Sequence, residues 1–451
     1  MVISIIISLW AILAIYLGMA IYFTNHFYFG SSINTLNVSG KNMEVVNKQL
    51  ASALHTYALN IKERGGKNEQ IKGEEVGLSY NSDGKFKDFK DKQNPYKWVS
   101  AVFNTEDSHM IEGVKYDNLL LKERLDKLSC FDRSNIVEPK NASFKYTDNG
   151  YVIVDEVDGT KVSSDILYDY VAAAILKEET TLDLESINCY VKPKYTSTSQ
   201  NIIDTLNTLN KYAFSKITYA FGEQKETLDG STINKWLTVD ENLNVTFDEK
   251  EVKNYVDILS TRHNTIGATR NFNTSHGNTI NVGGGDYGWS INRVKETQAL
   301  ITAIKEGQTI AKEPVYTQTA LSHGNNDIGN TYVEIDLTNQ HLWFYKNGSL
   351  ISQGDIVTGN VSSNHTTPGG IYKLKYKQKD AVLRGADYAA PVSFWMPFNG
   401  GIGIHDANWR GSFGGNIYKT SGSHGCINSP YYLAKAIFHN IEAGIPVVCY
   451  N

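Results

Sequence analysis

The chain is poor in cysteine and has no strong excess of charge of either sign. Its 451 residues contain only four cysteines, Cys130, Cys189, Cys426 and Cys449, and none of them forms a CxxC pair. This spacing excludes a disulfide-dense scaffold and a zinc ribbon. The 43 basic and 48 acidic residues give a formal net charge of −5, and there is no long basic run. The sequence therefore argues against a protein that binds nucleic acid.

Charge is also missing from the beginning of the chain. The first 40 residues contain no Lys, Arg, Asp or Glu, and Val2 to Phe23 is an apolar run broken only by two serines and one glycine. As a helix the run would reach about 33 Å, enough to cross a hydrocarbon core of about 30 Å. A cleaved signal peptide would have a shorter core and a basic start. Residues 1–25 are therefore predicted to be a transmembrane anchor, although no flanking charge sets its orientation.

The chain turns soluble in composition from about residue 30. Apolar residues spaced by three or four predict an amphipathic helix from Met43 to Tyr57 and a second from Ile166 to Ile175, with Ser164 as its N-cap. Both follow a Gly-containing turn and lead into strand-like runs. We therefore predict a loose duplication of one α+β unit over residues 30–145 and 146–318. Further helical stripes lie at 202–209, 252–259 and 294–304.

After a polar linker at 319–329, residues 330–451 have the pattern of a mainly β domain. Apolar and acidic residues alternate from Val333 to Leu337, which predicts a strand with one solvent-exposed face. The next apolar runs flank an Asn347-Gly348 turn and predict a hairpin. Another strand is expected over 371–379, with four lysines on one face; a charged edge strand is one explanation of them, contact with an anionic wall polymer another.

Two short segments of this domain carry the residues that can support catalysis. They are Ile404-His405-Asp406 and Ser423-His424-Gly425-Cys426. A cysteine nucleophile needs a thiolate, a nearby base and donors for the oxyanion. Two histidines flanking one cysteine can supply that arrangement, since a neighbouring imidazolium lowers a thiol pKa to about 3.5–7.5. Gly425 would let backbone N–H groups approach the substrate closely.

Other interpretations of these residues are weaker. Ser-His-Gly also occurs at 275–277 and 322–324, but only the third copy is followed by Cys, so the first two are predicted to be loops. A buried small hydrophobe is the prediction for Cys449 and not for Cys426. A zinc site made by His405, His424 and Cys426 would lack a fourth ligand. We expect no metal and no cofactor.

The composite motif resembles the L,D-transpeptidases of the YkuD type. It consists of His405, 17 intervening residues, Ser423-His424-Gly425-Cys426 and then Asn428. Trp409 and the turn Thr367-Pro368-Gly369-Gly370 also match, and the resemblance covers roughly 330–451. Upstream, Leu228-Asp229-Gly230 and Gly288-Trp289-Ser290-Ile291-Asn292 resemble the candidate peptidoglycan-binding domains that are often joined to this catalytic domain.

The resemblance implies a specific chemistry. Cys426 would attack the third residue of a peptidoglycan tetrapeptide stem and expel D-alanine, and an amine of an acceptor stem would resolve the thioester into a 3→3 cross-link. His405 would be the base, oriented by the backbone carbonyl of Asp406. Backbone N–H groups from His424 to Cys426 would form the oxyanion hole. The substrate pocket would be shaped by Ser423, His424, Trp409 and Asn428.

Two alternatives stay open at this point. With water as the acceptor, the same thioester chemistry makes an L,D-carboxypeptidase that trims tetrapeptide stems. The other alternative is a non-catalytic cell-wall-binding protein. The resemblance further implies acylation of Cys426 by carbapenem-type β-lactams. It also implies a single-pass location in the bacterial cell membrane, with the catalytic domain outside the cell and facing the wall.

Overall fold

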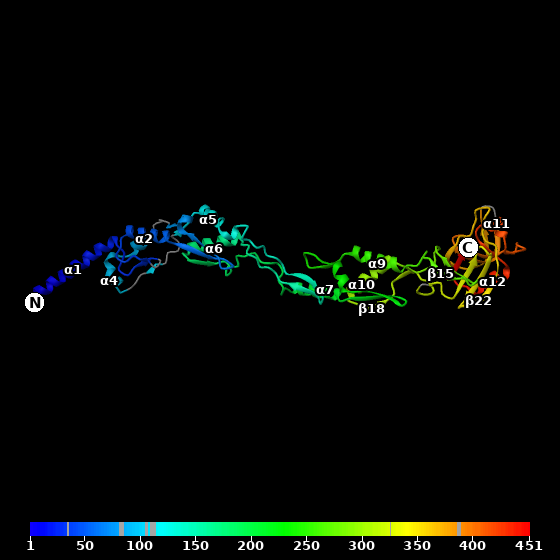
Figure 1. The fold of residues 1–451 in the computed structure, drawn as a ribbon. Helices are drawn as coiled ribbons and strands as arrows, with labels where there is room; N and C mark the ends of the chain where they lie inside the picture. The colour runs from blue at the N-terminus through cyan, green and yellow to red at the C-terminus, as the bar shows by residue number, and fades with distance from the viewer. Residues whose placement is uncertain (34–35, 81–84, 104–106, 109–113, 325, 386–388) are drawn as a thin grey trace. The chain divides into compact units, whose positions relative to one another are not determined.

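The protein divides into two compact units. The computed structural model describes residues 1–33, 36–80, 85–103, 107–108, 114–324, 326–385 and 389–451. One unit holds residues 1–143 and 153–202, and the other holds residues 144–152 and 203–451 (Figure 1). Each unit is built around its own hydrophobic core, so each is described separately.

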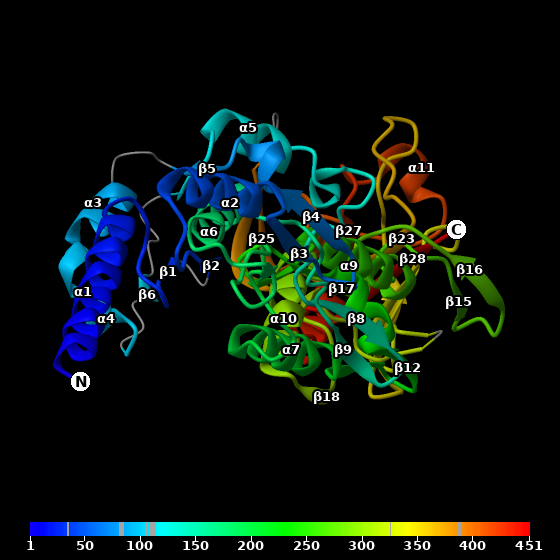
Figure 2. The same ribbon diagram turned by 90° about the vertical axis from the view of Figure 1, so that its left-hand side faces the viewer.

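The first unit begins with α1 (Val2–Asn25), which is long and apolar enough to cross a membrane by length and composition. Figure 2 shows α3 (Lys85–Lys92) and α4 (Trp98–Ala101) beside it. The predicted helix at 43–57 is confirmed as α2 (Met43–His55). The other elements are β1 (Ser32–Ile33), β2 (Leu36–Asn37), β3 (Ala58–Lys62), β4 (Asn68–Lys72), β5 (Ser79–Tyr80), β6 (Asp107–Ser108), β7 (Val114–Lys115), α5 (Asn118–Leu125), α6 (Ser164–Leu176) and β10 (Thr181–Asp183).

The duplication is visible in the sheets. In the first unit, β3 lies between β4 and a parallel β10, which follows α6. In the second unit, β11 (Lys216–Phe221) lies between β12 (Gln224–Leu228) and a parallel β18 (Thr309–Lys312), which follows α10 (Arg293–Glu306). Helix α6 is therefore the last helix of the first repeat and not the first helix of the second, because β10, the strand that follows it, pairs with β3. Ser163 is its N-cap residue, not Ser164.

The second unit holds the second repeat and the C-terminal domain. The remaining helices and strands of the second repeat, after a hairpin of β8 (Ser143–Thr147) and β9 (Gly150–Val154), are α7 (Gln200–Ala213), α8 (Gly230–Ile233), β13 (Leu237–Val239), β14 (Val245–Phe247), α9 (Glu249–His263), β15 (Arg270–Asn273), β16 (Thr279–Val282), β17 (Ser290–Ile291) and β19 (Tyr316–Gln318). Helices α7, α9 and α10 confirm the three stripes predicted at 202–209, 252–259 and 294–304.

The C-terminal domain packs two sheets around one core. The five-stranded sheet has the order β22-β21-β20-β28-β23, and the four-stranded sheet has the order β24-β25-β26-β27. Buried side chains of both sheets and of α12 form the core. The elements are β20 (Tyr332–Asp336), β21 (His341–Lys346), β22 (Ser349–Asp355), β23 (Gly370–Lys373), β24 (Gln378–Arg384), β25 (Ala389–Asn399), β26 (Ile402–Asp406), α11 (Ile417–Ser421), β27 (Ile427–Ser429), α12 (Tyr431–Asn440) and β28 (Pro446–Tyr450).

Two strand predictions differ from the structure. Strand β20 has no solvent-exposed face, because Glu334 is fully buried and accepts hydrogen bonds from Ser275 and Tyr450. The residues expected in one strand at 371–379 are split between β23 and β24. Lys375 of the connecting segment pairs with Asp286 of the second repeat, so it belongs to an internal contact rather than a free charged edge. The predicted hairpin around Asn347-Gly348 is confirmed.

Candidate active site

His405 lies on β26, in the middle of the four-stranded sheet. Its side chain is 3% exposed, between the rings of Trp395 and Trp409. The ring Nδ1 lies 2.9 Å from the backbone carbonyl oxygen of Asp406, which can only accept a hydrogen bond. Nδ1 therefore carries the proton and Nε2 keeps its lone pair, as a general base requires. The expected orienting role of the Asp406 carbonyl agrees with this geometry.

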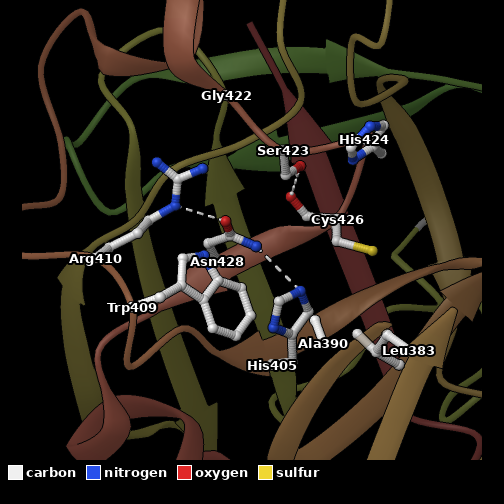
Figure 3. Close-up of a pocket in the computed structure, with 10 residues that line it drawn as sticks. All are labelled: Leu383, Ala390, His405, Trp409, Arg410, Gly422, Ser423, His424, Cys426 and Asn428. Carbon is white, nitrogen blue, oxygen red and sulfur yellow. Dashed lines mark hydrogen bonds between the residues drawn. The ribbon is translucent and has the colours of Figure 1, made fainter. Parts of the chain in front are cut away.

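A second hydrogen bond chain reaches His405 from the neighbouring strand. Parallel pairing of β26 with β27 sets Asn428 opposite His405, and the Asn428 Nδ2 donates to Nε2 of His405 at 3.0 Å. Arg410 Nε donates to Oδ1 of Asn428 at 2.7 Å (Figure 3). Because the guanidinium can only donate, it fixes which end of the Asn428 amide faces the imidazole. Arg410 thus holds His405 in the tautomer that leaves Nε2 unprotonated.

The environment of His405 keeps its ring neutral. Burial lowers the pKa of His405, because a charged imidazolium loses its hydration there; the Asp406 carbonyl and carboxylate act in the opposite direction. The Asp406 side chain is itself buried, and its Oδ1 accepts from the Phe394 N–H at 2.8 Å. Near neutral pH His405 is therefore a base and not an imidazolium.

Cys426 lies at the end of the Ser-His-Gly loop, directly before β27. Gly425 has a φ of +115°, and a Cβ at this position would lie 3.2 Å from Ile402, so the loop needs glycine here. The Cys426 Sγ donates to the carbonyl oxygen of Gly401 at 3.5 Å. Burial raises the pKa of the Cys426 thiol. Cys426 and His405 share no hydrogen bond in the described part of the chain, so this state is a neutral thiol beside a neutral imidazole rather than the ion pair that flanking histidines suggested.

The nucleophile loop is braced by two hydroxyl groups. Ser423 Oγ donates to the carbonyl oxygen of Cys426 at 2.6 Å and accepts from the Gly425 N–H at 3.0 Å. Thr367 Oγ1 donates to the Gly425 carbonyl oxygen at 2.7 Å and accepts from the Gly359 N–H at 3.0 Å. Of the N–H groups expected to form the oxyanion hole, that of Gly425 is therefore already engaged within the loop.

His405, Ser423 and Cys426 line one cavity of about 250 Å³. Trp409, 54% exposed, forms one wall, while His424 lies at the opposite side of Cys426 (Figure 3). Six of the eight predicted site residues line the cavity, and Asp406 and Gly425 support it from below the surface. The lining residues are Leu383, Ala390, His405, Trp409, Arg410, Gly422, Ser423, His424, Cys426 and Asn428.

Sequence reasoning missed Arg410 as a site residue. It follows the motif residue Trp409 directly, but its role depends on the pairing of β26 with β27, which no spacing reveals. The other two Ser-His-Gly copies lie in loops of the second repeat and beyond it, as predicted. Ser275 binds buried Glu334, and His323 stacks on Trp289 with ring centroids 3.9 Å apart.

Comparisons with known proteins match most of the chain to two family models. A family model described as the L,D-transpeptidase catalytic domain, YkuD, matches residues 330–449. A second model, for a candidate peptidoglycan binding domain, matches twice, at 69–183 and 195–311. No curated protein matches the chain.

Three solved structures are among those similar to the chain. A mutant of the Enterococcus faecium L,D-transpeptidase is 36% identical over 55% of this chain and 100% of its own, with a TM-score of 0.47. The avibactam carbamoyl enzyme named Ldtfm is also 36% identical, over 55% of this chain and 99% of its own, with a TM-score of 0.48. The catalytic domain from E. faecium L,D-transpeptidase acylated by ertapenem is 42% identical over 27% of this chain and 98% of its own, with a TM-score of 0.26.

The family assignment rests on the matched sequence. The matched ranges take in most of both repeats and of the C-terminal domain, and the solved chain of the 36% identical E. faecium enzyme is covered completely. The chain therefore belongs to the L,D-transpeptidases, with a YkuD catalytic domain at 330–449 behind two peptidoglycan-binding segments.

Proposed function

We propose that the protein is a membrane-anchored, cysteine-dependent acyltransferase that forms 3→3 cross-links in peptidoglycan. The observation that carries the proposal is the pocket in which Cys426 and the oriented base His405 lie together, in a chain of the L,D-transpeptidase family. The two segments that match the peptidoglycan-binding model support a cell-wall substrate.

In the acylation step, Cys426 attacks the carbonyl of the third residue of a tetrapeptide stem. The Sγ proton passes to Nε2 of His405, and the Sγ–C bond forms as the carbonyl oxygen takes up negative charge. The backbone N–H of Cys426 is our candidate for the oxyanion donor, since that of Gly425 is engaged with Ser423. When the tetrahedral intermediate collapses, the C–N bond breaks and His405 returns the proton to the departing D-alanine amine.

The resting geometry requires one rearrangement before this step. The thiol must leave the Gly401 carbonyl and the Asn428 amide must release Nε2 of His405, so that Sγ and Nε2 can meet. We propose that a bound stem makes this exchange favourable by excluding water from the pocket and competing for the Asn428 amide. A neutral pair costs little to keep in a buried site, whereas a preformed ion pair would carry a desolvation cost.

In the second step, a side-chain amine of an acceptor stem attacks the thioester. Its proton goes to His405, the new amide bond forms, and the Cys426 thiolate leaves and is reprotonated. Water in place of the amine would give a tripeptide, the product of an L,D-carboxypeptidase.

We further propose that α1 anchors the protein in the cell membrane, with both binding segments and the catalytic domain on the wall side. Helix α1 is apolar from Val2 to Phe23 apart from two serines and one glycine, and its residues 2–15 are exposed in the described unit. We also propose that carbapenems acylate Cys426, because an E. faecium catalytic domain 42% identical to this chain is acylated by ertapenem.

The test is mass spectrometry of purified disaccharide-tetrapeptides incubated with the full chain in detergent, beside Cys426→Ser. A cross-linked dimer that has lost one D-alanine, absent with Cys426→Ser, is the expected result. If tripeptide is the only product, the protein is an L,D-carboxypeptidase and the proposed transferase activity is wrong. Turnover that survives in Cys426→Ser would refute the thioester, and no product from either protein would favour a non-catalytic wall-binding protein.

A further inference from the structure

The second half of α1 is in contact with a later segment of the first unit. Trp98 Nε1 donates to the Tyr16 carbonyl oxygen at 3.2 Å, and the Tyr16 hydroxyl donates to the Tyr96 carbonyl oxygen at 2.6 Å. The Trp98 ring also lies 6.0 Å from that of Phe23. Residues 95–103, which we call the foot, therefore grip α1 along two turns. The foot consists of a 3₁₀ turn (Pro95–Lys97), α4 and the two residues after it (Figure 2).

The contact with the foot at Tyr16 lies nearer the middle of α1 than the polar end of the helix does. The apolar run of the helix ends at Phe23, and Thr24, Asn25 and His26 follow. Lys90 Nζ donates to the Phe23 carbonyl oxygen at 2.7 Å, so a charged group marks the level of this last apolar residue. Tyr16 is seven residues earlier, which is about 10 Å along the helix axis. A surface that ends at Phe23 would therefore have the foot about 10 Å below it, the depth to which interfacial helices bury their apolar faces.

The foot carries an exposed apolar surface in the described part of the unit. Four of its large side chains are exposed, although a soluble domain would normally bury some of them. Two exposed lysines, Lys92 and Lys97, lie in the same segment. Long lysine stems reach from an apolar layer to the headgroups. The exposed fractions are 63% for Tyr96, 43% for Val99, 53% for Val102 and 83% for Phe103.

We infer that the foot is a membrane-contact element that lies in the interfacial layer of the same bilayer that α1 crosses. The occupant of its apolar side is lipid rather than a protein partner, because the foot is hydrogen-bonded to Tyr16 of α1, about two turns inside the apolar run that ends at Phe23. Trp98 and Tyr96 of the foot are of the residue types that this layer favours. The exposed Lys87, Lys92 and Lys97 outnumber the exposed Asp88 and Asp91, which favours anionic headgroups. The inference rests on the proposed anchoring of α1.

The foot would give the anchor a second point of attachment. A single helix can rotate and tilt freely relative to the soluble domain that follows it. A foot held both to α1 and to lipid restricts that motion, so the rest of the segment at 69–183, within which the foot lies, leaves the membrane in a defined direction.

The experiment uses the full chain in liposomes of phosphatidylglycerol and phosphatidylethanolamine. One cysteine at a time is introduced by Phe103→Cys, Trp10→Cys or Lys67→Cys, in a Cys426→Ser background, and labelled with an environment-sensitive fluorophore. The other native cysteines are buried and will not react. Quenching is compared between lipids brominated near the headgroup and lipids brominated near the chain end. Lys67 is exposed in the same unit and is the aqueous control.

The Phe103 probe should be quenched several-fold more by shallow bromines than the Lys67 probe, while the Trp10 probe responds to deep bromines. A Phe103 probe as unquenched as the Lys67 probe, with Trp10 still quenched, would overturn the foot and leave the anchor standing. If none of the three is quenched, α1 does not insert and the proposed anchoring fails as well. To exclude a disturbed foot, Val102→Cys should repeat the Phe103 result.

Discussion

At the scale of single residues, the orientation of one amide helps to keep His405 in the tautomer that can act as a base. Arg410 donates to Asn428 Oδ1, and this leaves Nδ2 to face His405. In Arg410→Met the amide can turn over, and Oδ1 would then compete with the Asp406 carbonyl oxygen for the ring proton by accepting from an Nε2–H. That tautomer cannot take the thiol proton. We expect kcat/KM for the tetrapeptide donor to fall about 10- to 100-fold, with the fold preserved.

The matched control is Arg133→Met, at an exposed arginine of the first unit. It should leave the kinetics unchanged. The proton NMR signal of the imidazole N–H separates positioning from simple loss of structure, because Arg410→Met should shift it without lowering the melting temperature. Full activity in Arg410→Met would show that Asn428 keeps its orientation unaided.

The pKa values predict how Cys426 reacts in the absence of substrate. Its pKa is raised above the ordinary 9.0 of a thiol, so the thiolate fraction near neutral pH is smaller than for an unfolded cysteine. The pKa of His405 is lowered, so no imidazolium forms near pH 7 to offset this. Iodoacetamide alkylation of Cys426, followed by intact mass, should therefore keep accelerating beyond pH 9. A plateau reached by pH 7 would indicate a preformed ion pair and contradict this.

At the scale of elements, the nucleophile loop depends on a side chain from outside it. Thr367 Oγ1 connects the Gly359 N–H to the Gly425 carbonyl oxygen, and its side chain is buried. Thr367→Val keeps the shape but leaves both backbone groups without this partner. We expect stability to fall by about 1–3 kcal/mol and kcat to fall because the loop loses its brace. Exposed Thr366→Val is the control, and equal kinetics in the two variants would contradict a bracing role.

The same scale shows what the sequence could predict. Periodicity identifies α2, α7, α9 and α10, because each has one buried face, and the Asn347-Gly348 turn identifies its hairpin. Periodicity cannot tell which strand a helix leads into: it places α6 in the second repeat, whereas β10, which follows α6, pairs with β3 of the first. The prediction from alternation is also wrong at β20, where it gives Glu334 a solvent-exposed position. The Glu334 carboxylate is buried because Ser275, nearly 60 residues earlier in the chain, donates hydrogen bonds to it. Likewise, the motif predicts Cys426 and His405, whereas Arg410 becomes visible only when strands are paired.

At the scale of the whole second unit, the second repeat and the catalytic domain share a core. Phe272 and Tyr287 of the repeat pack with Ile371 and Val448 of the catalytic domain. Asp327, in the segment predicted to be a linker, forms a buried ion pair with Arg270 at 2.6 Å. Thr265 also donates to this carboxylate. The linker is therefore part of the interior of the unit, and the two domains should unfold together.

Arg270→Met tests this coupling. The substitution leaves the Asp327 carboxylate buried without its cation, which should lower the free energy of unfolding by about 3–5 kcal/mol. Because the core is shared, hydrogen exchange should accelerate in the catalytic strands β20 and β28 as well as in β15. Arg270→Met with Asp327→Leu removes both charges and should recover most of the loss, since a buried pair is worth little against apolar packing. Arg293→Met, at a half-exposed arginine of the same repeat, is the surface control. Faster exchange confined to β15, with β20 and β28 unchanged, would mean that the repeat and the catalytic domain unfold separately and that the catalytic pocket does not depend on the segment that precedes it.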